Sequence, residues 1–167
     1  MAMIFQILGA YVATVTSGII LEIPRHLRFQ TGFIGAAGYT VYLLTLPYVD
    51  LAVATLLGGI VIALFSQIAA RVLKSPVTVF YIPSYFPLVP GAGVYKIAYY
   101  YIQGNIPLSG KNFIESMFVS GAIALSVFLV DSALEIYTTV KKPKNQLIEI
   151  GGKDGNYQLL ETKSRKK

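Results

Sequence analysis

Five long apolar runs divide the chain, and short clusters of charged residues separate them. The runs cover residues 2–21, 32–48, 51–70, 76–103 and 113–140. The first, from Ala2 to Leu21, carries no charged residue. A helix rises ~1.5 Å per residue, so this run spans ~30 Å, the thickness of the hydrocarbon core of a bilayer. We therefore predict an all-α polytopic membrane module over residues 1–140, with five transmembrane helices at these positions.

The fourth run contains a segment that interrupts regular helix. The sequence YIPSYFPLVPGAGVY, residues 81–95, carries three prolines and two glycines. Proline lacks a backbone N–H and crowds the preceding turn, so it breaks or kinks a helix. Residues 76–103 would also make a continuous helix of about 42 Å, which exceeds the ~30 Å core. We expect two half-helices that meet near mid-membrane, with a break near residues 87–91, and a simple proline kink is the alternative.

The distribution of charge predicts the orientation. The chain carries 14 Lys and Arg against 8 Asp and Glu, and most of the basic residues fall in the 22–31 loop, the 71–75 loop and the tail at 141–167. Five crossings put these three segments on one side of the membrane. Because short basic loops stay on the cytoplasmic side, we expect a multi-pass protein of the cell (plasma or inner) membrane, with its N-terminus outside and its C-terminus in the cytoplasm. A re-entrant fourth segment would separate the loops from the tail, so we reject it.

Composition excludes several classes of protein. Of the 167 residues, 54% are hydrophobic and 13% are charged, whereas a soluble domain carries about a quarter charged residues. The net charge of +6 lies mostly in the tail, which favours a cytoplasmic extension over a nucleic-acid surface. Two alternating runs around a Gly-Lys-Asp-Gly turn predict a short β-hairpin in that tail. The absence of cysteine excludes disulfides and thiolate metal sites.

Tyrosines and small residues follow patterns with two interpretations each. Tyr39, Tyr42 and Tyr48 gather toward the expected outer end of the second helix, which is typical of an interfacial belt or of general packing. Small residues at four-residue spacing let membrane helices approach closely, either between subunits or within one chain. The spaced sets are Gly9, Ala13 and Ser17; Ala54 and Gly58; Thr55 and Gly59; and Ser120 and Ala124.

Candidate chemistry lies at the break in the fourth run. A half-helix that starts near Gly91 would present backbone N–H groups, and Lys96 lies one turn farther on. Together they suit a carboxylate, whereas the alternative is that Lys96 snorkels or pairs with an acid. The pathway candidates at the break are Pro87, Pro90, Gly91, Gly93 and Lys96. The candidate charge partners or proton carriers are Glu115, Asp131 and Glu135.

Catalytic signatures are absent from the sequence. It contains no H-E-x-x-H, no G-x-S-x-G and no phosphate-binding G-x-x-x-x-G-K-[ST] motif. The one histidine, His26, lies in a basic loop. We expect no catalytic residue, no metal site and no cofactor, and we do not expect an enzyme.

The stretch PVTVFYIPSYFPLVPGAGVYKIAYYYIQGN resembles the threonine/serine exporter family, specifically its C-terminal membrane module. EIPRHLRFQTGFIGAAGYTVYLL also resembles the loop and second helix of that family. The resemblance covers residues 1 to about 140, the basic tail has no counterpart in it, and it adds Tyr95 to the pathway candidates. The positions that carry the family pattern are Pro76, Pro87, Leu88, Val89, Pro90, Gly91, Tyr95, Lys96, Gly104 and Asn105.

This resemblance implies a secondary exporter of threonine and serine or, as in a two-component subgroup, of small dicarboxylates such as succinate. It also implies that the chain is the small subunit of a split exporter, with a larger membrane subunit of the same family as its partner. A small carboxylate-bearing substrate, the lipid bilayer and a higher oligomer of such pairs complete the implied partners. Two alternatives remain: a non-transporting scaffold or regulatory subunit whose partner holds the whole site, and an intramembrane enzyme, which no motif favours.

Overall fold

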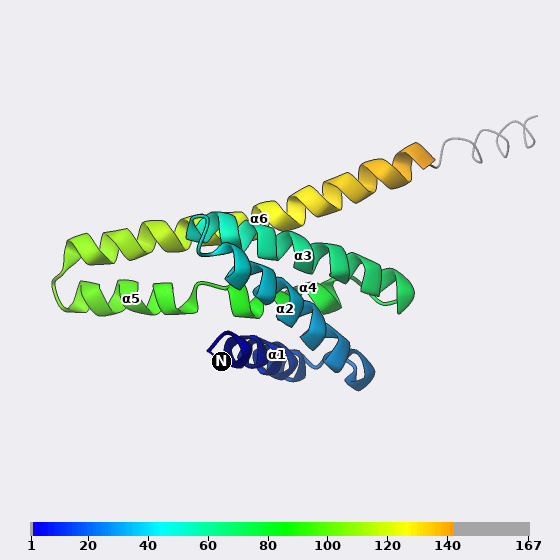
Figure 1. The fold of residues 1–167 in the computed structure, drawn as a ribbon, viewed down its shortest axis with the longest axis horizontal. Helices are drawn as coiled ribbons and strands as arrows, with labels where there is room; N and C mark the ends of the chain where they lie inside the picture. The colour runs from blue at the N-terminus through cyan, green and yellow to red at the C-terminus, as the bar shows by residue number, and fades with distance from the viewer. Residues whose placement is uncertain (1, 142–167) are drawn as a thin grey trace, which may run out of the picture. The chain divides into compact units, whose positions relative to one another are not determined.

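The computed structural model describes residues 2–141, and every regular element in that part of the chain is a helix (Figure 1). The elements are α1 (Ala2–Ile20), α2 (Arg25–Thr45), α3 (Leu51–Val72), α4 (Thr78–Tyr85), the 3₁₀ helix η1 (Phe86–Leu88), α5 (Gly91–Ile102) and α6 (Ile106–Lys141). The prediction of an all-α protein is confirmed for these residues. The β-hairpin predicted in the tail lies outside them.

The chain forms two units, Met1–Val130 and Asp131–Lys167, and α6 contributes to both. Among the described residues, three segments are long and apolar enough to cross a membrane: Met3–Ile20, Leu51–Val72 and Ile106–Tyr137. The helices α4 and α5, with 8 and 12 residues, are each too short to do so alone. The structure thus supports a helical membrane protein, while the five crossings stay a prediction.

Two helices begin earlier than the apolar runs that predicted them. The second run starts at residue 32, but α2 begins at Arg25, directly after Pro24. The fifth run starts at residue 113, but α6 begins at Ile106. The physical reason is that a charged residue ends an apolar run without ending a helix. Backbone geometry decides the helix start, and proline, with its fixed φ, is compatible with the entry to α2.

The helices α1, α3 and α5 end in the same backbone motif. The second residue after each end adopts a left-handed conformation: Glu22 with φ 55°, Lys74 with φ 50° and Gly104 with φ 74°. The next N–H then reaches back to a carbonyl in the last turn, as in the 3.0 Å bond from Ile23 to Gly18 and the 2.9 Å bond from Asn105 to Tyr100. This bond satisfies a carbonyl that the end of the helix would otherwise leave unpaired.

Glycines bring α1, α2 and α3 into close contact. A Cβ at Gly38 of α2 would lie 2.9 Å from the carbonyl oxygen of Gly58 on α3, and a Cβ at Gly35 would collide with the side chain of Thr14 on α1. The predicted pair Ala54 and Gly58 is therefore used for packing within the chain. Gly9, from another predicted set, makes no such contact, because a Cβ there would meet nothing within 4 Å among the described residues.

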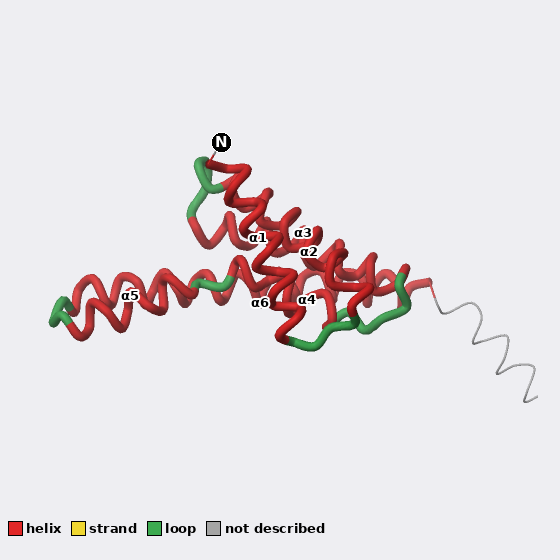
Figure 2. Tube along the Cα trace, turned by 90° about the horizontal axis from the view of Figure 1, so that it is seen from below, coloured by secondary structure: helices red, strands yellow, loops and turns green. Residues whose placement is uncertain are grey.

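The fourth run is divided into α4, η1 and α5 (Figures 1 and 2). Val89 is extended, with φ −62° and ψ 132°, and Pro90, with φ −75° and ψ 51°, precedes the first residue of α5. The helix is therefore interrupted at these two residues, inside the predicted 87–91 range. Whether the interruption lies within a membrane stays a prediction.

The two sides of this interruption are held differently. Tyr85 of α4 is buried, and its hydroxyl donates to the carbonyl of Gly59 on α3 at 2.7 Å and lies 3.0 Å from Ser126 Oγ on α6. In contrast, α5 contains no buried residue in the described structure. It runs beside the first half of α6, where Ser109 Oγ donates to the carbonyl of Ile97 at 2.9 Å. The interruption thus joins an anchored half-helix to one without a buried residue in this part of the chain.

Candidate functional site

A polar cavity lies beside the interruption. Its volume is about 360 Å³, within the range of ~300–1,000 Å³ that small-molecule sites occupy. Four parts of the first unit form its wall, namely α2, α3, the segment from η1 to α5, and the first half of α6. The lining residues are Tyr39, Tyr42, Leu51, Thr55, Pro87, Leu88, Val89, Pro90, Ala92, Gly93, Lys96, Asn112, Glu115, Ser116 and Val119.

The interrupted segment supplies backbone and a positive charge. Pro87 and Pro90 line the cavity where regular helix stops, so main-chain groups of η1 and α5 approach it. Gly93 and Lys96 follow in the first turns of α5 and share one face, because residues three apart on a helix are neighbours. The side chain of Lys96 is exposed rather than embedded. The break thus brings a lysine ammonium and the start of a helix to one site.

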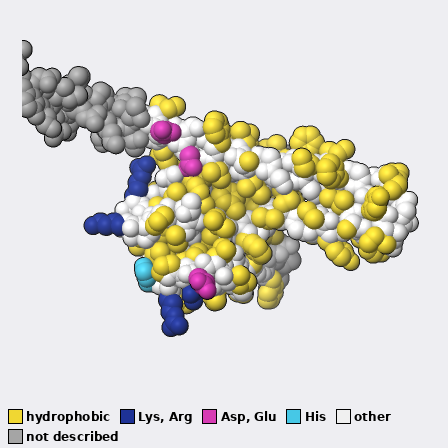
Figure 3. All heavy atoms as spheres, turned by 180° about the vertical axis from the view of Figure 1, so that it is seen from behind, with side chains coloured by type: hydrophobic (Ala, Val, Ile, Leu, Met, Phe, Trp, Pro, Cys, Tyr) yellow, Lys and Arg dark blue, Asp and Glu magenta, His cyan; other side chains and the backbone are white. Residues whose placement is uncertain are grey.

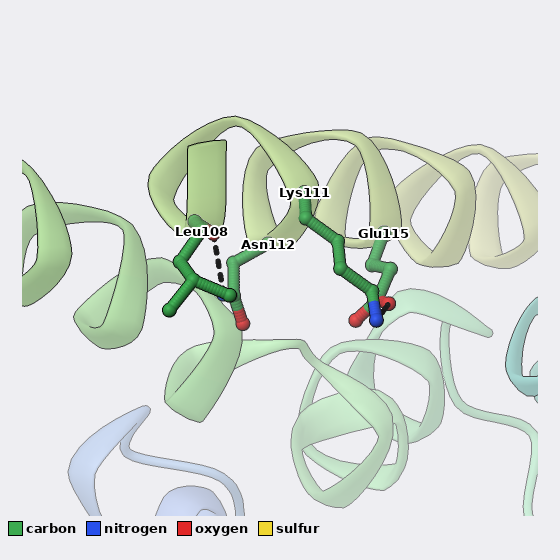
Figure 4. A network of polar contacts seen from close by, with 4 residues as sticks. All are labelled: Leu108, Lys111, Asn112 and Glu115. Carbon is green, nitrogen blue, oxygen red and sulfur yellow. Dashed lines mark hydrogen bonds and ion pairs between the residues drawn. The ribbon is translucent and has the colours of Figure 1, made fainter. Parts of the chain in front are cut away.

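The first half of α6 supplies the opposite charge. Asn112, Glu115 and Ser116 line the cavity from adjacent positions on one face of α6. Glu115 also lies 3.9 Å from the ammonium of Lys111, and Asn112 donates its amide to the carbonyl of Leu108 at 2.8 Å (Figure 4). The Glu115 side chain is 50% exposed, and such an exposed pair is worth less than ~1 kcal/mol. Glu115 therefore adds a carboxylate to the same cavity as Lys96.

Aromatic and hydroxyl groups from α2 and α3 form the rest of the wall. Tyr39 and Tyr42 lie on one face of α2 with ring centroids 5.4 Å apart, and both line the cavity. Thr55 of α3 donates its hydroxyl to the carbonyl of Leu51 at 2.7 Å. The sequence pattern had grouped Tyr39 and Tyr42 with Tyr48, but Tyr48 is 86% exposed and does not line the cavity. Tyr39 and Tyr42 therefore belong to the cavity wall, whereas Tyr48 does not.

The structure brings five of the predicted site residues together and leaves others apart. The five that line the cavity are Pro87, Pro90, Gly93, Lys96 and Glu115. Gly91 and Tyr95 are not part of that lining. Tyr95 is 68% exposed and stacks on Tyr99 with ring centroids 6.0 Å apart.

Two predicted acids lie outside the unit that contains the cavity. Asp131 and Glu135 belong to the second unit, so their pairing with Lys96 stays a prediction. Among the described residues, no group of three His, Cys, Asp or Glu side chains could hold a metal ion.

Sequence reasoning missed the polar residues that other helices contribute. Asn112, Ser116, Tyr39, Tyr42 and Thr55 all line the cavity. One signal could have found two of them: Asn112 and Ser116 are polar residues at four-residue spacing, on the same helix face as Glu115. The tyrosines and Thr55 gave no such signal, because only the packing of α2 and α3 against the break brings them to the site.

A helical chain with membrane-capable segments and a small polar cavity at an interrupted helix has the features of a membrane transport protein. Residues 6–133 match the family described as Threonine/Serine exporter, ThrE, and the chain belongs to this family. No curated protein and no solved structure matches it. The chain is therefore a membrane protein of the threonine/serine exporter type, and its family consists of transporters rather than enzymes. The resemblance noted in the sequence is confirmed.

Proposed function

We propose that this chain is the small membrane subunit of a secondary exporter of threonine and serine and acts with a larger membrane subunit of the same family. The observation that carries the proposal is the cavity of about 360 Å³ at the interrupted helix, with Lys96 and Glu115 on its wall. In this proposal the cavity lies on the substrate route. The family indicates the class of substrate, and the charges of the cavity indicate which substrates of that class it binds.

The two charges of the cavity favour an amino acid over a dicarboxylate. At neutral pH an amino acid carries one carboxylate and one ammonium, which complement Lys96 and Glu115 respectively. Succinate carries two carboxylates, and one of them would meet Glu115. Like charges brought together in this way cost several kcal/mol. We therefore assign threonine or serine, and not succinate, to this cavity.

Five membrane crossings follow from this proposal: α1, α2, α3, the α4–α5 segment and α6. Basic side chains support the orientation, because Lys and Arg gather at one end of the molecule (Figure 3). Arg25, Arg71 and Lys74 are exposed there, in or beside the α1–α2 and α3–α4 connections. The positive-inside rule assigns this end to the cytoplasm, so the N-terminus lies outside and the C-terminus in the cytoplasm.

Two observations support the larger subunit. Irregular backbone and a charged residue such as Lys96 are tolerated inside a membrane only where protein or water covers them. In the described structure, α5 has no buried residue, and an apolar groove of about 500 Å³ follows its contact with α6. A membrane subunit laid against this surface would shield the cavity from lipid. In this proposal, several such pairs assemble into a higher oligomer to form the complete exporter.

Vesicles that contain both subunits test the proposal. Lys96→Ala and Glu115→Gln should each lower kcat/KM for threonine by roughly 10- to 100-fold, since each removes one charge partner of the substrate. Lys74→Ala, which removes an exposed lysine outside the cavity, is the matched control and should change little. Unchanged transport in a correctly assembled Lys96→Ala complex would instead favour the scaffold or regulatory role. Competition by succinate as strong as that by serine would overturn the choice of substrate.

A further inference from the structure

The first turn of α5 presents unpaired donors to the cavity. Pro90 is the N-cap residue and makes no capping hydrogen bond through its side chain in the described structure. The N–H of Gly91 donates to the carbonyl of Val89 at 2.7 Å, and the first helical bond runs from Val94 to Pro90 at 3.0 Å. Helix geometry leaves the N–H groups between them, those of Ala92 and Gly93, without an intrahelical acceptor. Both residues line the cavity.

A second donor group faces the same turn from α6. Ser116 lines the cavity and is only 7% exposed, and within the described part of the chain its Oγ has no hydrogen-bond partner. A Cβ placed on Gly93 would collide with this Oγ, so the hydroxyl points directly at the first turn of α5. Neighbouring serines of α6 differ, because Ser109 and Ser126 donate to the carbonyls of Ile97 and Ile123.

We propose that the Ser116 hydroxyl and the N–H groups of Ala92 and Gly93 form the carboxylate subsite of the cavity. The inference rests on the proposed function and deepens it. All three groups are donors, and a carboxylate is the part of an amino acid that only accepts hydrogen bonds. The start of α5 adds the positive end of the helix dipole, and Lys96 adds a full charge one turn farther on. Glu115 then remains for the substrate ammonium.

The glycine at position 93 has a role in this subsite. Any side chain there would displace the Ser116 hydroxyl from the start of α5. The break, Gly93 and Ser116 therefore act together: the break exposes the amides, the missing side chain makes room, and the hydroxyl completes the set. Gly91 makes no such approach, because a Cβ on it would meet nothing within 4 Å in the described structure.

The test uses the complete exporter in vesicles, with L-serine and its amide, in which a neutral carboxamide replaces the carboxylate. Ser116→Ala should weaken the apparent affinity for serine about tenfold, since a hydrogen bond to a charged group is lost. Inhibition by the amide should weaken much less, because its neutral carboxamide oxygen accepts a weaker hydrogen bond than a carboxylate does. Gly93→Ala should weaken serine affinity in the same direction.

Ser66→Ala is the matched control, because Ser66 is the other buried serine of the described chain whose Oγ has no partner, and it lies outside the cavity lining. It should leave both affinities unchanged. An unchanged serine affinity in Ser116→Ala would overturn the subsite, and so would an equal loss for serine and its amide, which would mean that Ser116 recognises another part of the substrate. A wild-type exporter that does not take serine at all would contradict the proposed function, and the subsite with it.

Discussion

Individual residues carry backbone strain at two of the three helix ends that have a left-handed residue. Glu22, Lys74 and Gly104 adopt left-handed backbone conformations after α1, α3 and α5. Glycine adopts this conformation without a steric penalty, whereas a Cβ clashes with the following carbonyl at a cost of ~1–2 kcal/mol. Only the end of α5 has a glycine at this position. Glu22 and Lys74 therefore keep a steric cost that glycine would remove.

Glu22→Gly should therefore stabilise the protein by about 0.5–1 kcal/mol, less than the full strain because glycine also gains freedom in the unfolded chain. Loss of a negative charge beside the C-terminus of α1 acts in the same direction. Gly104→Ala should destabilise by ~1–2 kcal/mol, although a Cβ there meets nothing within 4 Å in the described structure. Equilibrium unfolding in detergent measures both. A stabilising Gly104→Ala would show that backbone strain is not the deciding term.

Most of the site residues that the sequence predicted correctly are neighbours in sequence as well as in space, and Glu115 on α6 is the exception. Pro87, Pro90, Gly93 and Lys96 lie on one short segment, so proline spacing and a lone lysine were enough to select them. Ser116 comes from another helix, and its role depends on an absent side chain at Gly93. No pattern in the sequence links these two positions. Packing creates that part of the site.

At the scale of elements, one tyrosine links three helices. The hydroxyl of Tyr85 on α4 donates to the carbonyl of Gly59 on α3 and lies 3.0 Å from Ser126 Oγ on α6. Tyr85→Phe should destabilise by about 1 kcal/mol, because the ring still packs but buried polar groups lose a partner. Tyr48→Phe is the control, since Tyr48 is 86% exposed and its hydroxyl faces the surroundings. Thermal unfolding in detergent compares them, and equal shifts would argue against the link.

The contact between α2 and α3 gives a second prediction for elements. A Cβ at Gly38 would lie 2.9 Å from the carbonyl of Gly58 and closer still to the side chain of Ile62. Gly38→Ala should therefore cost ~1–3 kcal/mol through overpacking. Gly121→Ala in α6, where nothing lies within 4 Å among the described residues, should be neutral or stabilise by up to ~1 kcal/mol through helix propensity. The free energies of unfolding of the two variants measure these effects. A neutral Gly38→Ala would show that α2 and α3 can move apart to accept the added methyl group.

The helical character of the chain could be predicted better than the bounds of its helices. Apolar runs located the helices because lipid and a protein core both select apolar side chains. They misplaced the starts of α2 and α6, at Arg25 and Ile106, because hydropathy reports where charge begins and not where backbone hydrogen bonding begins. The position of the interruption, at Val89 and Pro90, could be predicted because proline acts on the backbone directly.

At the scale of the whole molecule, the two ends of the bundle differ in charge. Basic residues gather at the end with the α1–α2 and α3–α4 connections, while the connections at 46–50 and 103–105 lie toward the opposite end (Figures 1 and 3). The fourth segment decides the topology. If α4 and α5 together cross the membrane, residues 73–77 and 103–105 face opposite compartments. If the segment is re-entrant, they face the same one.

Cysteine labelling can distinguish these arrangements, and the chain is well suited to it because it contains no cysteine of its own. Ser75→Cys, in the α3–α4 connection, should react with a membrane-impermeant maleimide only from the cytoplasmic side. Gln103→Cys, after α5, should react only from outside, and Tyr48→Cys, beyond α2, should behave in the same way. A cysteine at Gly93 should be slower from either side, because the cavity restricts access. Cytoplasmic labelling of Gln103→Cys would establish a re-entrant α4–α5 segment, reverse the side assigned to α6 and exclude the five-crossing topology.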